Sequence, residues 1–283
     1  MGQPASHQQY RATFSNKTIP HTTMRRVAII IASPLHRSRQ YFLKGVAQDV
    51  AGYKSFLASA TGGAYEPGTE IHSFVDPDYK AISKIRSLCR HADVAFVIFS
   101  GHGFMQGNTN YLLINEHQAI DHEELTTGAT RQITLIDACR TGVKDLPFTG
   151  DVPAGYRFIQ SHKPTARRWY NNYVKQCPPG KVWLFSASAG EPSADSEAGG
   201  QFSVSFLRSV ERWANLAHQS GKILLPQGAL KSSVDYLKRR LGNHGQRPTH
   251  EKAGWGERLP IAVGLPAVAA FKRQTPYHFP SML

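Results

Sequence analysis

The chain has 283 residues, of which 41% are hydrophobic and three are cysteine. This length and hydrophobic content suffice for one large core or two smaller ones. Three cysteines without a Cys-x-x-Cys pair argue against a disulfide framework and against a structural zinc site. The early apolar run Val27–Ala32 is too short to span a membrane and lies too far from Met1 for a secretory signal. We therefore expect a cytoplasmic protein without a membrane partner.

The net charge is +13, and the excess of basic residues is concentrated in residues 1–26, 142–180 and 231–283. Such segments are typical of nucleic-acid-binding proteins, but they also occur as solvated loops. The sequence has no helix-turn-helix pattern, no aromatic-rich RNA-binding strand and no glycine-rich phosphate loop. We therefore favour solvated loops and do not expect a nucleic-acid partner.

Three regions differ in composition. Residues 1–24 are polar and lack periodicity, which predicts a flexible tail. Residues 25–272 are expected to form a single domain, followed by a C-terminal tail at residues 273–283. Within the domain, the segment 143–180 is rich in Pro, Gly and basic residues, and we interpret it as an irregular insertion.

Continuous apolar runs alternate with amphipathic segments along the domain. The runs predict strands, in chain order RVAIIIAS, EIHSFV, DVAFVIFS, QITLIDAC, KVWLFSAS and RLPIAVG. The amphipathic segments predict helices at residues 39–58, 76–92, 202–218 and 226–241. Asp76 is the expected N-cap of the second helix, with Pro77 in its first turn. This alternation predicts an α/β fold with a mostly parallel central sheet and helices on both faces.

Two predicted strands end in residues that can carry chemistry. FSGHGF places Ser100, His102 and Gly103 at one strand end, and DACRTG places Asp137 and Cys139 at the next. If these strands are neighbours in a parallel sheet, His102 and Cys139 should meet at its edge. An imidazole beside a thiol can generate the nucleophilic thiolate, and the amide of Gly103 is free to bind an oxyanion. A structural cysteine and an ordinary loop histidine are the alternative, but the strand-end positions favour catalysis.

These two motifs resemble the caspase–metacaspase superfamily of cysteine peptidases (clan CD). In that family a Ser/Gly-His-Gly sequence ends one strand, and a short Asp/Gln-x-Cys sequence ends the next. The resemblance extends, in the order of elements, over roughly Arg26 to Gly264. Asp137 replaces the Gln of animal caspases, and Thr141 is one extra residue after Arg140, so the sequence is more similar to metacaspases and their bacterial relatives. The resemblance implies the caspase-like fold and a cysteine endopeptidase.

The residues around the catalytic pair also predict the substrate. Asp137 and Cys139 project to the same side of their strand, and a carboxylate so near a thiolate is unfavourable unless a cation neutralises it. This predicts a pocket for Arg or Lys immediately before the scissile bond.

The helical sequence LKGVAQDVAGY supports the same pocket. It resembles a metacaspase stretch whose Asp lines the basic-residue pocket together with the Ser two before the catalytic His and the Asp two before the catalytic Cys. The resemblance thus assigns substrate binding to Asp49, Ser100 and Asp137. Taken singly, Asp49 could be a solvated helix residue and Asp137 a turn-initiating residue.

The resemblance further implies self-cleavage within the segment 143–180, which contains Lys144, Lys163, Arg167 and Arg168. A structural excursion with solvated charges is the alternative for this segment. By analogy with bacterial relatives we expect a triggered role in antiphage defence or cell death, with an activating sensor protein as partner.

No cofactor or metal is expected. Calcium activates many metacaspases, but the sequence shows no dedicated acidic cage for it. The remaining alternative is a catalytically silent caspase-fold module that binds an acidic protein or a nucleic acid.

Overall fold

The computed structural model describes residues 24–35, 41–141, 146–147, 155–216, 221–241 and 246–264. Its central strands are β1 (Arg26–Ser33), β2 (Ile71–Val75), β3 (Val94–Gly101), β7 (Arg131–Asp137), β9 (Gly180–Phe185) and β12 (Thr249–Gly254). They form one sheet in the order β12-β9-β7-β3-β1-β2. Neighbouring strands pair in parallel except β12, which is antiparallel to β9. The predicted α/β fold with a mostly parallel sheet is therefore confirmed.

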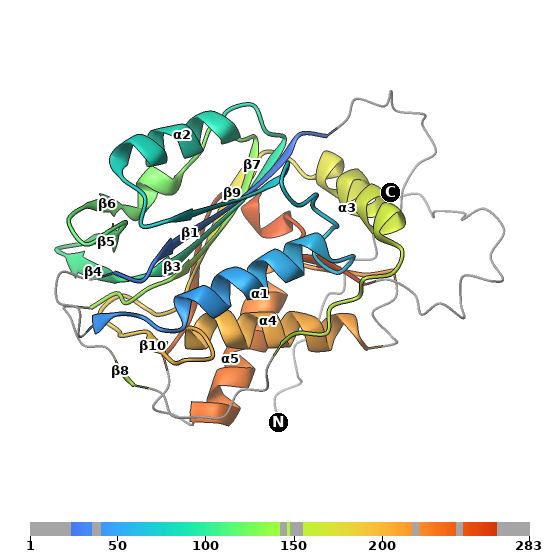
Figure 1. The fold of residues 1–283 in the computed structure, drawn as a ribbon. Coiled ribbons are helices and arrows are strands. Elements are labelled where there is room, and N and C mark those ends of the chain that lie inside the picture. The colour runs from blue at the N-terminus through green and yellow to red at the C-terminus, as the bar shows by residue number, and fades with distance from the viewer. Residues whose placement is uncertain are drawn as a thin grey trace, which may run out of the picture.

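Helices cover both faces of this sheet (Figure 1). They are α1 (Val46–Ala58), α2 (Tyr79–Cys89), α3 (Lys163–Gln176), α4 (Gln201–Ala214) and α5 (Pro226–Leu241). Successive strand side chains point to opposite faces, so Ile30 packs on the side of α1 and α4, whereas Ile29 and Ile31 pack on the side of α2. Because both faces are buried at the centre of the sheet, β1 and β3 are apolar along almost their whole length, whereas the residues of the edge strands β2 and β12 are partly or fully exposed.

Shorter strands surround the central sheet. A three-stranded antiparallel sheet follows β3 and consists of β4 (Gly103–Gln106), β5 (Thr109–Leu113) and β6 (Ala119–Asp121). Two further pairs are β8 (Leu146–Pro147) with β10 (Ala194–Asp195), and β11 (Ile223–Leu224) with β13 (Ala262–Val263). The predicted strand RLPIAVG therefore contributes only β13, outside the central sheet, because Ile261 to Val263 are buried against the helices of the α1 side.

Two helix starts differ from the sequence prediction. Helix α1 begins at Val46 instead of residue 39, after Gly45 donates its N–H to Asp195 Oδ2 at 3.3 Å. Helix α2 is capped by Asp78 instead of Asp76, because the Asp78 carboxylate accepts the N–H of Ala81 at 2.7 Å. Asp76 has a φ of 44° and forms the turn after β2.

The segment 143–180 contains a helix, so its interpretation as an irregular insertion is wrong. Helix α3 buries Ala166, Tyr170 and Val174, which recur at every fourth position along one face. Pro164 lies in its first turn, where a proline costs no hydrogen bond. The many basic residues of the segment obscured the spacing of these apolar residues, so the sequence pattern did not predict the helix.

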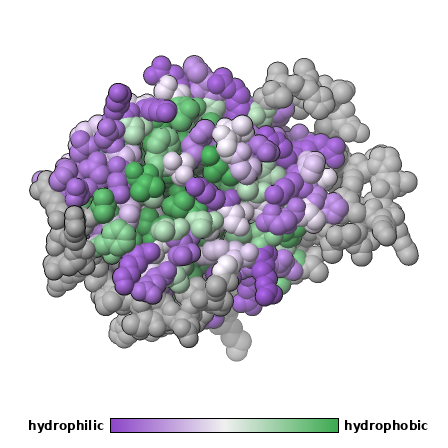
Figure 2. All heavy atoms as spheres, in the orientation of Figure 1, coloured by the Kyte–Doolittle hydropathy of each residue, from purple (hydrophilic) through white to green (hydrophobic). Residues whose placement is uncertain are grey.

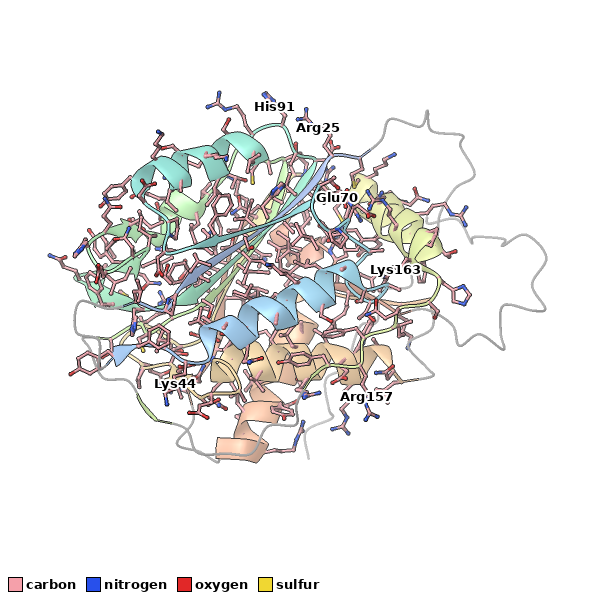
Figure 3. The ribbon with its side chains drawn as sticks, viewed as in Figure 1. Arg25, Lys44, Glu70, His91, Arg157 and Lys163 are labelled. Atoms are coloured by element: carbon pink, nitrogen blue, oxygen red, sulfur yellow. The ribbon has the colours of Figure 1, made fainter. Side chains whose placement is uncertain are left out.

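At one end of the sheet, Glu70 binds two arginines. Arg26 of β1 donates to both carboxylate oxygens at 3.3 and 2.7 Å, and Arg167 of α3 does so at 2.9 and 2.5 Å. The Arg26 side chain is fully buried, with its guanidinium 4.2 Å from the centre of the Tyr65 ring. Burial alone would raise the pKa of Glu70, but the arginines outweigh it and hold that pKa below its usual value. Figure 3 shows Glu70 at the end of the sheet away from Lys44.

The predicted tails fall mostly outside the described residues. Met24, the last residue of the predicted N-terminal tail, is buried in the core on the α1 side. Figure 2 shows hydrophobic residues gathered between α1 and α2, whereas mainly hydrophilic residues cover α2. Within the described ranges, no helix is long and apolar enough to cross a membrane.

Candidate active site

The ends of β3 and β7 lie side by side. Ser100 in β3 pairs with Asp137 in β7, and His102 and Cys139 each follow two residues later. A cavity with an empty volume of about 310 Å³, part of it open to solvent, lies at these strand ends. Five of the six predicted site residues line it: Asp49, Ser100, His102, Asp137 and Cys139. The fold thus brings the two sequence motifs and helix α1 to one place.

Cys139 is held in a well-supported turn beyond β7. The preceding residue, Ala138, is anchored to the end of β9, because the Ser186 hydroxyl accepts its N–H at 3.1 Å and donates to its carbonyl at 2.9 Å. Cys139 as a residue is 8% exposed, and its thiol contacts the main chain of Ser193. Ser193 donates its N–H to Sγ at 3.2 Å, and Sγ donates to the Ser193 carbonyl at 3.4 Å. The N–H contact would stabilise a thiolate at this position.

His102 and Gly103 connect β3 to β4. His102 is buried, and its carbonyl accepts the N–H of Leu113 at 3.0 Å. Gly103 starts β4 beside the cysteine. A Cβ atom at Gly103 would lie 2.7 Å from the Cys139 carbonyl oxygen and 2.9 Å from the Ala138 Cβ, so a larger residue would displace the turn that carries the thiol. The role of the Gly103 amide in binding an oxyanion stays a prediction.

Asp49 lies on the first turn of α1 and is 2% exposed. Ser100 donates its hydroxyl to Asp49 Oδ2 at 2.6 Å, and the N–H of Gly200 contacts both carboxylate oxygens at 3.1 and 3.3 Å. A Cβ atom at Gly200 would come within 2.4 Å of Asp137 Oδ2 and 3.2 Å of Asp49 Oδ2. Only glycine therefore allows the start of α4 to approach both carboxylates.

Asp137 is the second buried carboxylate of the cavity. Its Oδ2 accepts the N–H of Ser203 at 2.8 Å, and its Oδ1 accepts the hydroxyl of Ser193 at 2.9 Å. Burial raises the pKa of Asp137, although these hydrogen bonds oppose the shift. Burial and the neighbouring charge of Asp137 raise the pKa of Asp49 well above its usual value. No Lys or Arg among the described residues forms an ion pair with either carboxylate.

Asp195 is a third acidic residue of the cavity that the sequence reasoning did not single out. It lines the same cavity, and its charge contributes to the raised pKa of Asp49. Its sequence signal is weak, since it lies in a loop of small residues after KVWLFSAS. Glu191 in the same loop has a different role, because it pairs with Arg247 outside the cavity.

In the part of the chain that the structure describes, no group of three or more His, Cys, Asp or Glu side chains is placed to hold a metal ion.

A parallel sheet that presents a cysteine and a histidine at two adjacent strand ends is the architecture of a caspase-like protein. Residues 25–252 match the family model of the caspase domain, Peptidase C14. Because this match covers most of the chain, the protein belongs to the caspase-domain family, as the sequence motifs predicted. No curated protein sequence matches the chain significantly.

Solved caspases have a similar fold. Caspase-1 from Spodoptera frugiperda is 14% identical, with a TM-score of 0.51, and the match covers 87% of this chain and 92% of that chain. The Drosophila initiator caspase Dronc is 9% identical, with a TM-score of 0.53, and the match covers 93% of this chain and 95% of that chain. At these identities the likeness shows the fold alone, and the predicted closeness to bacterial metacaspases stays a prediction.

Proposed function

We propose that the protein is a cysteine endopeptidase in which Cys139 is the nucleophile and His102 the general base. His102 takes the thiol proton as sulfur bonds to the scissile carbonyl carbon, and it then gives that proton to the leaving amine. Water activated by the same imidazole hydrolyses the resulting thioester and frees the thiol. The Gly103 amide is the proposed donor to the oxyanion. Membership of the caspase-domain family and the cavity that both residues line support this assignment.

We further propose that cleavage follows an Arg or Lys residue. The observation that carries this proposal is the pair of buried carboxylates, Asp49 and Asp137, in the cavity that also contains Cys139. Each carboxylate accepts hydrogen bonds from neutral donors, which do not cancel its negative charge, and burial together with the charge of Asp137 raises the pKa of Asp49. A guanidinium or ammonium group would neutralise this negative charge, whereas a substrate aspartate would add another.

A panel of fluorogenic peptides that differ only in the residue before the scissile bond tests both proposals. We expect hydrolysis after Arg and Lys but not after Asp, and none by the Cys139→Ala variant. A preference for Asp would refute the acidic pocket and leave the peptidase assignment intact. No hydrolysis of any peptide, combined with tight binding of nucleic acid or of an acidic protein, would favour the interaction module.

We also propose self-cleavage within the segment 143–180, outside helix α3. A residue of a hydrogen-bonded helix must unfold before it can enter a peptidase site, and Arg167 is additionally bound to Glu70. Arg157 precedes the helix, is exposed and lies in an irregular stretch, so it is the best-placed described candidate. Mass spectrometry of incubated wild type and Cys139→Ala should find fragments in the wild type alone. Fragments in both samples would contradict self-cleavage.

The biological role is proposed from the resemblance of the sequence motifs to bacterial metacaspase-like proteins. We place the peptidase in the cytoplasm, in a triggered defence or cell-death pathway with an activating sensor protein. Bacteria that express the wild type should survive phage challenge better, as a population, than bacteria that express Cys139→Ala. Equal survival of the two populations would contradict the defence role.

A further inference from the structure

Ser193 contacts both halves of the candidate site. Its main-chain N–H and carbonyl contact Cys139 Sγ at 3.2 and 3.4 Å, and its hydroxyl donates to Asp137 Oδ1 at 2.9 Å. The nucleophile and the acidic pocket are therefore bridged by one residue of a loop. A loop residue holds such a position only if its own main chain is fixed.

The support for this loop comes from Gln246, which lies just before β12 and is 8% exposed. Its Oε1 accepts the N–H of Ala194 at 2.8 Å and contacts the Ser193 hydroxyl at 3.4 Å. Its Nε2 donates to the Ser186 carbonyl at 2.9 Å, at the end of β9. The side chain thus ties the loop to the central sheet through one amide group.

Ser186 is the same residue that anchors the turn of Cys139, since its hydroxyl bonds both the N–H and the carbonyl of Ala138. The connection Gln246–Ser186–Ala138 therefore reaches the turn of Cys139 from the central sheet, and the connection Gln246–Ala194–Ser193 reaches its thiol from the loop. A neutral amide suits this place because it can accept from the loop and donate to the sheet at the same time. A carboxylate or an aliphatic side chain of similar size cannot do both.

We infer that Gln246 is a positioning residue, which fixes Ser193 over Cys139 and against Asp137 and so aligns the nucleophile with the acidic pocket. The inference rests on the proposed peptidase function and adds to it a residue that does not line the cavity. Loss of the amide should leave the sheet intact, release the loop, expose the thiol and loosen the pocket wall.

Gln246→Met tests the inference, because methionine keeps the volume and removes the hydrogen bonds. Its kcat/KM on an Arg peptide should fall about tenfold to a hundredfold, as expected for the loss of two or three buried hydrogen bonds. Residue-resolved mass spectrometry should show iodoacetamide alkylating Cys139 several-fold faster than in the wild type. The buried Cys89 and Cys177 are internal controls, and their alkylation rates should not change.

Two further variants sharpen the test. Ser193→Ala removes the hydroxyl bond to Asp137 but keeps the main-chain contacts with Cys139, so it should raise KM for Arg peptides while Cys139 alkylates at the wild-type rate. Gln176→Met is the matched control, since Gln176 lies on the surface of α3 and, among the described residues, its amide bonds only within that helix. It should change neither measurement.

Two outcomes for Gln246→Met would overturn the inference: wild-type kinetics with wild-type alkylation, or faster alkylation of all three cysteines together. The second outcome would mean that Gln246 stabilises the whole fold. If the wild type itself cleaves no Arg peptide, the proposed function fails, but the alkylation rates still decide whether Gln246 positions the loop over Cys139.

Discussion

Buried carboxylates lie at both ends of the central sheet, in opposite electrostatic conditions. Glu70 binds two arginines, which hold its pKa below the usual value against the effect of burial. Asp49 and Asp137 lie at the other end, where burial and like charge raise the pKa of Asp49. The carboxylate at the first end is paired with cations of the protein, whereas no Lys or Arg among the described residues forms an ion pair with Asp49 or Asp137.

This difference distinguishes a buried charge that stabilises the fold from a buried charge that is available to bind a ligand. A buried carboxylate that is paired with cations holds segments of the chain together. Removing one partner of such a pair leaves the other buried without its counter-charge. Like charges buried in a cavity reduce stability, and such perturbed groups cluster at functional sites. Substitutions at the Glu70 end should therefore change stability first, and those at the Asp137 end should change activity first.

The largest expected effect is that of Cys139→Ala on activity. Hydrolysis of Arg peptides should fall by about 10⁴-fold or more, because no other group supplies the nucleophile. The melting temperature, followed by circular dichroism, should stay close to that of the wild type. Residual cleavage above that level would assign the chemistry to another group.

Asp137→Asn should have the second-largest effect. Its kcat/KM for Arg peptides should fall about a hundredfold, as expected when one partner of a buried charge pair is lost. Asparagine can still accept one of the hydrogen bonds that Asp137 makes with Ser193 and Ser203. Because the substitution removes one of two like charges, thermal stability should not fall in parallel with activity. A parallel fall of both would place Asp137 with Glu70 among the structural charges.

Glu70→Gln should have the opposite profile. It leaves the fully buried guanidinium of Arg26 without its carboxylate, which should lower the free energy of unfolding by about 3 to 5 kcal/mol. Urea unfolding measures this loss. At a temperature where the variant is still folded, its kcat/KM should match that of the wild type, and a strong loss of activity there would break the separation between the two ends.

The smallest effect is the pH dependence, and its sign differs between the two ends. The folded-state pKa of Asp49 is raised, so the stability that its protonated form contributes is present at acid pH and is lost as pH rises through that pKa. Stability of the wild type relative to Asp49→Asn should therefore fall as pH rises from about 4. For Glu70 the folded-state pKa is lowered, so its contribution is lost as pH falls, and the cost of Glu70→Gln should shrink in acid. Melting temperatures of both variants across a pH series check the two signs.

Much of the fold could be predicted because its main elements carry local patterns. Strands buried on both faces have uninterrupted apolar sequences, so β1, β3, β7 and β9 stand out. Helix α3 was missed because its buried residues, Ala166, Tyr170 and Val174, lie among polar and basic residues, and Trp169 and Tyr173 are only partly buried against the core. The strands β4 to β6 are short and half exposed, and their pairing depends on a neighbouring strand instead of on their own composition.

The candidate site likewise contains residues that local sequence patterns predict and residues that they do not. Ser100 and Asp137 lie at the ends of the apolar strands β3 and β7, and His102 and Cys139 follow two residues later. The assumption that these strands are neighbours was therefore enough to predict that the four residues meet. Asp195 and Gln246 could not be found in this way. They lie in loops after β9 and before β12, and their relation to Cys139 arises only when those loops fold over the ends of β7 and β9.

The Glu70 cluster has a consequence for a chain that has been cut once. Glu70 lies before the segment 143–180 and Arg167 lies in helix α3, after residue 162, so the ion pair between them joins the two sides of any nick between Thr141 and His162. Strand β7 also stays paired with β9 across such a nick. A processed molecule would thus run as two polypeptides on a denaturing gel and as one particle, heavier than the uncut chain by one water, in native mass spectrometry.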